Sequence, residues 1–312
     1  MGCIGVDTSC YRTSVAFADA SGYVQQRRLV DVPMGQTGLM QSELMFQHVK
    51  RLPDLIEALI APGMRIDCLC ATVRPRPQAD SYMPVFRAGE GVARAMAAAL
   101  RVPFLETTHQ QCHLRAAMYG QNCFDAPFLA MHLSGGTTEI MLAKPDLSIE
   151  LLGGTSDLHA GQFVDRAGVA LGCAFPAGPH LEEMAVLPPQ SMLPVSVRGL
   201  SCSFSGAETQ IQRIIAAKTH PQAQIAAEVY SLLVRTIARM LEAAAEQTGI
   251  RQVLLFGGVA SSALFRKMLC ERLRNRRIRL TVEWANPDLS GDNAVGAALI
   301  GLDRLSEVVD NQ

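Results

Sequence analysis

Two segments of the chain, nearly half its length apart, repeat one pattern: an apolar strand, a turn of small residues and a second apolar strand. In the first segment, residues 2–6 and 13–18 flank the turn Asp7-Thr8-Ser9. In the second, residues 128–133 and 138–142 flank the turn Ser134-Gly135-Gly136-Thr137. A unit repeated at this separation predicts a duplicated α/β fold of two lobes with a cleft between them.

Other segments have the period of strands or of helices. Residues 23–29 continue the first unit as the third strand of a meander. The segment Arg74-Pro75-Arg76-Pro77 predicts a loop, because each proline lacks an N–H donor and restrains the residue before it. The remaining elements that we expect are strands over 68–73, 149–152 and 253–256, and helices over 44–59, 87–100, 225–244 and 260–274.

The composition excludes several classes of protein. A hydrophobic content of 49% with 18% charged residues rules out disorder, and 312 residues are enough to bury a substantial core. No apolar stretch reaches the roughly 18 residues that a membrane-spanning helix needs, so we expect no membrane partner. Nine cysteines, an odd number, without a secretory leader predict a cytoplasmic location.

The charges give no overall attraction to nucleic acid, because the net charge is −1. One stretch near the C-terminus is nevertheless strongly basic, with Glu271 as its only acid. It is either a solvated helix face or a surface for RNA phosphates, and without interleaved aromatic residues it would contact backbone and shape rather than bases. This basic cluster consists of Arg266, Lys267, Arg272, Arg274, Arg276, Arg277 and Arg279.

Three turns that follow strands are built from glycine and hydroxyl residues. They are Asp7-Thr8-Ser9, Ser134-Gly135-Gly136-Thr137, and Gly257-Gly258 with the serines that follow it. Glycine lets a ligand approach the main chain, whose N–H groups can hold phosphate oxygens. Each alone is typical of an ordinary tight turn. Together they resemble the two phosphate loops and the adenosine loop of an actin-like, Hsp70-like or sugar-kinase-like ATPase fold, which is a duplicated ribonuclease H-like fold.

His109 and His113 lie four residues apart in a segment compatible with a helix. Both imidazoles would then project from one face and could share a cation, although a pair alone is also typical of a surface helix. A third ligand must come from elsewhere in the chain. Asp292 is the best candidate, because we expect it to open the final helix.

The order of these motifs resembles the universal tRNA N6-threonylcarbamoyladenosine transferase family, formerly described as O-sialoglycoprotein endopeptidases. The resemblance covers nearly the whole chain. It rests on residues 4–10, the pair His109 and His113, residues 133–138, Phe163-Val164-Asp165-Arg166, Phe175-Pro176-Ala177-Gly178-Pro179, Ser203-Phe204-Ser205-Gly206, Gly257-Gly258-Val259 and Asp292-Asn293.

The resemblance implies a two-lobed α/β fold with an N-terminal lobe of residues 1–105 and 293–312. A C-terminal lobe of residues 106–292 would include a metal-binding helix over 107–119. The implied metal ligands are His109, His113 and Asp292, and Asp7 is the candidate catalytic residue. The implied contacts to ATP or threonylcarbamoyl-AMP are Leu133, Ser134, Gly135, Gly136, Thr137, Asp165, Gly178, Gly257, Gly258 and Ser262. Taken alone, Asp165 is either a ribose contact or a surface carboxylate paired with Arg166.

For activity, the resemblance implies a metal-dependent transfer of threonylcarbamoyl from its adenylate to a tRNA adenosine. The expected cofactor is a divalent metal, iron or zinc, with magnesium as a further candidate. Two imidazoles and a carboxylate by themselves suit iron, zinc and manganese about equally. The implied partners are tRNA, a smaller actin-like paralogue and an accessory ATPase, with the chain in a homo- or heterodimer.

The chain departs from the family pattern at several positions. Where the family has two acidic residues after the first turn, this chain has Tyr11-Arg12, which replaces two negative charges with a phenol and a cation. Thr137 stands in place of a histidine, Ser262 in place of an asparagine, and residues 74–84 in place of a glycine-rich segment. These departures leave open a diverged paralogue that acts as a nucleotide-binding scaffold or partner subunit, or an acyl or carbamoyl transferase with another acceptor. Arg12 would either contact a phosphate or carboxylate, or face solvent in the hairpin.

Overall fold

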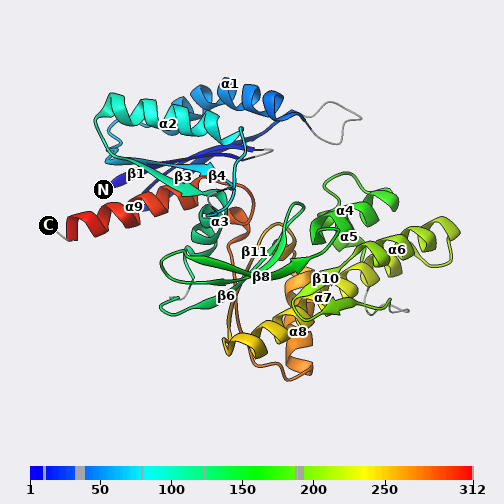
Figure 1. Ribbon diagram of the computed structural model, residues 1–312. Coiled ribbons are helices and arrows are strands. Elements are labelled where there is room, and N and C mark those ends of the chain that lie inside the picture. Colours follow the sequence, from blue (N-terminus) through cyan, green and yellow to red (C-terminus); the bar gives the residue numbers. More distant parts are fainter. Residues whose placement is uncertain are drawn as a thin grey trace. The chain divides into compact units, whose positions relative to one another are not determined.

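The chain divides into two compact units in a computed structural model that describes residues 1–9, 12–31, 39–78, 80–121, 124–186, 188 and 193–310 (Figure 1). Unit 1 contains Met1–Tyr119 and Gly291–Gln312, and unit 2 contains Gly120–Ser290. These boundaries differ from the expected ones, since residues 106–119, 291 and 292 belong to unit 1. The reason is packing, because the helix that carries His109 and His113 lies against the C-terminal helix.

Unit 1 contains a five-stranded sheet in the order β3-β2-β1-β4-β5. The first three strands form the expected antiparallel meander, and β4 and β5 continue the sheet in parallel with β1. The expectation that Asp7-Thr8-Ser9 is a turn is wrong, since these residues continue β1 and pair with β2. The strands are β1 (Gly2–Ser9), β2 (Arg12–Asp19), β3 (Gly22–Leu29), β4 (Cys68–Arg74) and β5 (Phe104–Thr108).

Helices cover both faces of this sheet (Figure 1). On one face, Ile4 and Val6 of β1 pack in an apolar cluster with Leu52 and Ala88. On the other face, the C-terminal helix lies against β1 and β4, and it also packs against the histidine helix. The helices are α1 (Gln41–Leu59) and α2 (Phe86–Leu100) on the first face, and α3 (His109–Met118) and α9 (Val295–Asp310) on the second.

Unit 2 contains a seven-stranded sheet in the order β12-β11-β6-β7-β8-β10-β9. Its segment β8-β7-β6-β11-β12 repeats the strand order and the strand directions of the unit 1 sheet, which agrees with the expected duplication. The strands are β6 (Phe128–Leu133), β7 (Thr138–Ala143), β8 (Ile149–Thr155), β9 (Ser196–Arg198), β10 (Ser201–Ser203), β11 (Gln252–Phe256) and β12 (Thr281–Trp284).

The core of unit 2 is built around α7 (Gln222–Thr248), whose apolar side chains are buried along most of its length. This helix extends the expected segment at both ends and ends at Gly249, which has a left-handed backbone conformation. No helix in the described part of the chain is long and apolar enough to cross a membrane. The other helical elements of the unit are α4 (Ala160–Ala170), α5 (Gly178–Met184), α6 (Ser205–Ala217), η1 (Val259–Ser261), α8 (Ala263–Asn275) and η2 (Pro287–Leu289).

Candidate metal and nucleotide sites

The two histidines lie on one face of α3, as their spacing predicts. The helix begins directly after Thr108, whose hydroxyl accepts a hydrogen bond from the Gln111 N–H at 3.2 Å while the Gln111 side chain accepts from the Thr108 N–H. This reciprocal cap fixes the first turn of the helix. The Nε2 atoms of His109 and His113 lie 3.0 Å apart. Two nitrogens at this distance need a proton or a cation between them.

Asp292 reaches the same point from the segment before α9. Its Oδ1 atom lies 3.2 Å from His113 Nε2 and 3.7 Å from His109 Nε2. The expectation that Asp292 opens the last helix is wrong, since α9 begins at Val295 and the Asn293 side chain accepts a hydrogen bond from the Val295 N–H. Asp292 therefore lies in a loop held by the beginning of α9.

The close contact of α9 with α3 depends on Gly296. A Cβ atom at this position would lie 1.8 Å from the carbonyl oxygen of Cys112, which stands between the two histidines in the sequence. The absence of a side chain lets the two helices approach until Asp292 meets the histidines.

Asp7 is fully buried and orients one of the histidines. Its Oδ1 atom accepts a hydrogen bond from the Thr72 hydroxyl at 2.5 Å and lies 3.0 Å from His109 Nδ1. A proton held at Nδ1 leaves the Nε2 lone pair of His109 directed at His113 and Asp292, as in the carboxylate–histidine pairs of metal sites. Asp7 is thus placed as a positioning residue rather than as a metal ligand.

The protonation of these groups follows from their charges. Burial disfavours the charged form of His109, but the charge and hydrogen bond of Asp7 outweigh it and raise the pKa of His109 to about 9. Burial would raise the pKa of Asp292, but the hydrogen bond of His113 and the positive charge of His109 hold that pKa well below its usual range.

The three residues fit a divalent metal by both geometry and donor chemistry. One ligand atom from each of His109, His113 and Asp292 lies within 4.8 Å of the other two, and these residues form the only such group of three among the described residues. Two imidazole nitrogens and one carboxylate oxygen suit zinc, iron or manganese, and three protein ligands leave positions for a substrate.

Arg12 lies beside this group rather than in solvent. Its side chain is partly buried, and its Nη1 atom donates to the carbonyl oxygen of Asp292 at 3.3 Å. Tyr11, the other departure from the acidic pair, lies outside the described residues. The proline segment that replaces the glycine-rich one also reaches α3, because the carbonyl oxygen of Pro75 accepts from the Gln110 N–H at 3.0 Å.

In unit 2, the turn between β6 and β7 has two exposed glycines and is closed by a backbone hydrogen bond. The Ser134 N–H donates to the Thr137 carbonyl at 2.8 Å, while Gly135 and Gly136 are exposed. The first turn of α4 packs directly on this turn, because a Cβ atom at Gly161 would lie 2.6 Å from the Gly135 nitrogen. The Gly136 N–H donates to the Ser134 hydroxyl at 3.3 Å, so an anion bound at this turn would take over that donor.

The turn after β11 lies next to the turn after β6. Gly257 has a φ of +100°, and a Cβ atom there would lie 2.3 Å from the Leu133 carbonyl oxygen, so only glycine fits. The Leu133 side chain lies in the core, which leaves only its backbone for a ligand. The helix expected over 260–274 begins later, at Ala263, because the Ser262 hydroxyl accepts from the Phe265 N–H at 3.0 Å and caps it.

Asp165 has a partner other than the neighbouring arginine. Its Oδ1 atom accepts from the Ala177 N–H at 2.8 Å, which ties α4 to the segment before α5. Burial raises the pKa of Asp165, although the N–H groups of Ala177 and Gly178 oppose this shift. Gly178 is the first residue of α5, and its carbonyl oxygen accepts from the Tyr230 hydroxyl at 3.1 Å. A cavity of about 440 Å³ borders Asp165, with Gln162 and Phe175 among its lining residues.

The basic cluster has two partly buried arginines and five exposed members. Arg266 donates to the carbonyl oxygens of Ala260 and Ala285 and lies over the ring of Trp284. Arg272 is partly buried on α8, where burial and the like charges of neighbouring arginines lower its pKa. The exposed members are Lys267, Arg274, Arg276, Arg277 and Arg279.

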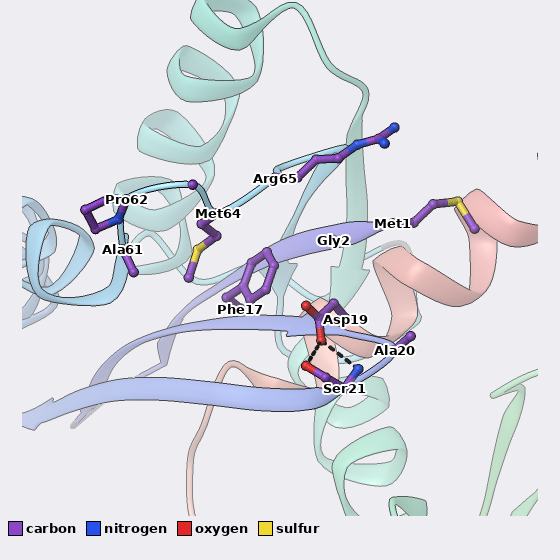
Figure 2. Close-up of a pocket in the computed structure, with 11 residues that line it drawn as sticks. Met1, Gly2, Phe17, Asp19, Ala20, Ser21, Ala61, Pro62, Met64 and Arg65 are labelled. Carbon is purple, nitrogen blue, oxygen red and sulfur yellow. Dashed lines mark hydrogen bonds between the residues drawn. The ribbon is translucent and has the colours of Figure 1, made fainter.

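Two features of the structure have no counterpart in the sequence patterns. Asp157, which no sequence pattern singled out, accepts hydrogen bonds from the hydroxyls of Ser203 and Ser205 at the start of α6. A cavity of about 580 Å³ lies at the other end of β1 from Asp7, where Phe17 and Met64 form one wall and Asp19 accepts from Ser21 (Figure 2). None of the residues that line this cavity was predicted to bind a ligand.

Comparison with known proteins agrees with the motif order. A family model described as tRNA N6-adenosine threonylcarbamoyltransferase (TsaD) matches residues 38–299. A protein of Polaromonas sp. (strain JS666) described as tRNA N6-adenosine threonylcarbamoyltransferase is 30% identical over 316 residues, which cover 95% of this chain and 89% of the relative.

Solved structures with 12–16% identity share the fold. Full-length HypF, in a phosphate- and nucleotide-bound form, matches 96% of this chain with a TM-score of 0.62, and the chain spans 55% of its length. Component A of (R)-2-hydroxyglutaryl-CoA dehydratase from Acidaminococcus fermentans matches 98% of this chain and 99% of its own, with a TM-score of 0.57. A ROK family glucokinase from Streptomyces griseus matches 97% of this chain and 100% of its own, with a TM-score of 0.55. The α/β fold with two sheets is therefore that of the actin-like ATPases and sugar kinases, as expected.

Proposed function

The chain belongs to the tRNA N6-adenosine threonylcarbamoyltransferase family, and we propose that it transfers a threonylcarbamoyl group from its adenylate to an adenosine of tRNA in a metal-dependent reaction. The observation that carries this proposal is the convergence of His109, His113 and Asp292 in a chain of a family that generally uses a metal. Two ligands on one helix face and a third from the loop before α9, with a buried orienting carboxylate on β1, are more than a packing accident.

The first part of the proposed mechanism concerns the metal ligands. His109 and His113 would bind a divalent metal through Nε2, and Asp292 through a carboxylate oxygen. Asp7 would hold the proton at His109 Nδ1 and so keep Nε2 free to bind. The metal, when bound, supplies a Lewis acid that polarises the acyl carbonyl or a phosphate oxygen.

The second part concerns the nucleotide contacts in unit 2. The N–H groups of Gly135 and Gly136 would hold the phosphate, with the Ser134 and Thr137 hydroxyls as further donors. Since one oxygen of Asp165 accepts from the Ala177 N–H, the other would accept from a ribose hydroxyl. Gly178, Gly257, Gly258 and Ser262 would shape the adenosine contact.

The proposed transfer balances as an acyl substitution. The adenine N6 amine attacks the carbamoyl carbonyl carbon, a C–N bond forms, and the C–O bond to the phosphate breaks. AMP leaves with the bonding electron pair, and the amine loses one proton to a base or to solvent. Positioning of the amine and the carbonyl supplies much of the rate enhancement in reactions of this kind.

The proposed partners follow from the family and from the charges of unit 2. The exposed arginines at the end of α8 would contact the tRNA backbone, and such contacts weaken as salt concentration rises. We also propose a smaller actin-like paralogue and an accessory ATPase as protein partners, with the chain in a homo- or heterodimer.

A second candidate function is a diverged family member that binds the metal and nucleotide but acts as a scaffold or on another acceptor. It is favoured by Arg12, a cation beside Asp292 where the family has an acid. The two candidates differ in whether tRNA becomes modified.

The deciding experiment is the transfer of labelled threonylcarbamoyl from its adenylate to unmodified tRNA, with the accessory proteins added and the metal content measured on the same sample. Label in tRNA, lost in the His113→Ala variant together with the metal, supports the transferase. The matched control is His220→Ala in unit 2, which should keep both. Bound metal and nucleotide without labelled tRNA would overturn the transferase in favour of the second candidate.

A further inference from the structure

The carboxyl end of β1 and the start of β2 place two polar side chains on the face of the sheet that carries Asp7. Ser9 and Arg12 are cross-strand partners, as are Asp7 and Ser14. Because directly paired residues share a face and alternate residues along a strand return to it, Ser9 and Arg12 lie on the Asp7 side. The contacts agree, since Asp7 meets His109 and Arg12 meets the Asp292 backbone.

Arg12 has donors left after its contact with Asp292. Among the described residues, its guanidinium makes a hydrogen bond only through Nη1, to the Asp292 carbonyl oxygen. It makes no ion pair with a described carboxylate. A Cβ atom at Gly291 would lie 3.2 Å from Nη1, so the guanidinium rests on this peptide segment with no side chain in between. A planar fork held in this way suits a bidentate contact with a carboxylate or phosphate.

The Ser9 hydroxyl is a second donor at the same place. Ser9 is 3% exposed, and its Oγ atom is buried with no hydrogen-bond partner among the described residues. A buried hydroxyl without a partner costs free energy, which a bound acceptor would recover. Arg27, the cross-strand partner of Ser14 on β3, adds a nearby positive charge.

We infer that Arg12 and the Ser9 hydroxyl form an oxyanion subsite beside the metal ligand Asp292, which takes a carboxylate or phosphate of the ligand held at that site. The inference rests on the proposed metal site. The family pattern has two acids at the position of Tyr11-Arg12, which would repel an anion. With Arg12 there instead, a ligand of this chain needs an anionic group at the subsite.

The test measures ligand binding to the zinc-loaded full-length protein by calorimetry, in the absence of tRNA. The probes are inorganic phosphate, N-carbamoyl-L-threonine as the carboxylate, and the amide of the latter compound as its uncharged control. We expect Arg12→Gln to weaken the binding of both anions at least tenfold and to leave the binding of the amide unchanged. The anion affinities of Arg12→Lys should lie between those of Arg12→Gln and those of the unmodified chain. Arg213→Gln, at an exposed arginine on α6 of unit 2, is the matched control and should bind like the unmodified chain.

The relative affinities of the two anions identify which oxyanion the subsite prefers. If Arg12→Gln loses its zinc, Ser9→Ala replaces it, and there we expect at least a threefold loss of anion affinity with zinc retained. If Arg12→Gln bound both anions as tightly as the unmodified chain does, or lost as much affinity for the amide as for the anions, the inference would be overturned. Since no tRNA is present, failure of this subsite and failure of the transferase reaction are separate results.

Discussion

Asp7 Oδ1 lies 3.0 Å from His109 Nδ1, and this contact joins the first strand of the chain to the first helical residue of α3. The two residues are 102 positions apart in the sequence. The contact sets which nitrogen of His109 can bind a metal, and it leads to the first prediction.

Replacing Asp7 with Asn should lower zinc affinity about 10- to 100-fold, because a neutral amide orients and polarises the imidazole less well than a carboxylate. Competition with a fluorescent chelator measures this change. Ser14→Ala, on the neighbouring strand of the same face, serves as the control. Unchanged zinc affinity in the Asp7→Asn variant would show that His109 needs no orienting charge.

The second prediction is that zinc binding strengthens with pH. His109 has a pKa of about 9 without metal, so at neutral pH its imidazole carries a proton that a metal must displace. A raised pKa means that the competing protonated form is present below pH 9 and is lost above it. The apparent dissociation constant should therefore fall by about tenfold per pH unit between pH 6 and 8 and level off above 9. A flat profile over this range would show that His109 is already deprotonated.

The third prediction concerns the helix contact that brings Asp292 to the histidines. Gly296→Ala forces α9 away from the Cys112 carbonyl, so it should lower zinc affinity at least tenfold and destabilise unit 1 by about 1–3 kcal/mol. Gly91→Ala is the control, since a Cβ atom at that helical position meets nothing within 4 Å. Equal zinc affinity in the Gly296→Ala and Gly91→Ala variants would show that metal binding does not depend on the close contact between α9 and α3.

The fourth prediction tests a buried ion pair in unit 2. Arg235 Nη2 lies 2.7 Å from Glu228 Oε1, and both residues bind the backbone of Leu193. Arg235→Ala leaves a buried carboxylate without its cation and should lower the free energy of unfolding by about 3–5 kcal/mol. Urea unfolding followed by Trp284, the only tryptophan of the chain, reports on this unit. The exposed Arg239 on the same helix is the control, and its change to Ala should cost less than about 0.5 kcal/mol.

Much of the fold could be predicted because its signals are local. Apolar runs followed by small residues mark β1, β2, β6 and β7, and the repeat of this pattern reflects a five-stranded order that both sheets share. The short strands β9 and β10 escaped prediction, because three residues carry too little periodicity to be recognised.

The sequence by itself determined that His109 and His113 share a helix face, because the period of the α-helix places residues i and i+4 together. It also determined that glycine turns follow β6 and β11 of unit 2. Only the tertiary structure decided that Asp7 and Asp292 meet these histidines and that Arg12 meets Asp292, since contacts between residues over 100 positions apart depend on how helices and strands pack. The Gly296 contact shows the reason, because the distance of Asp292 from the histidines depends on a packing approach that no local pattern encodes.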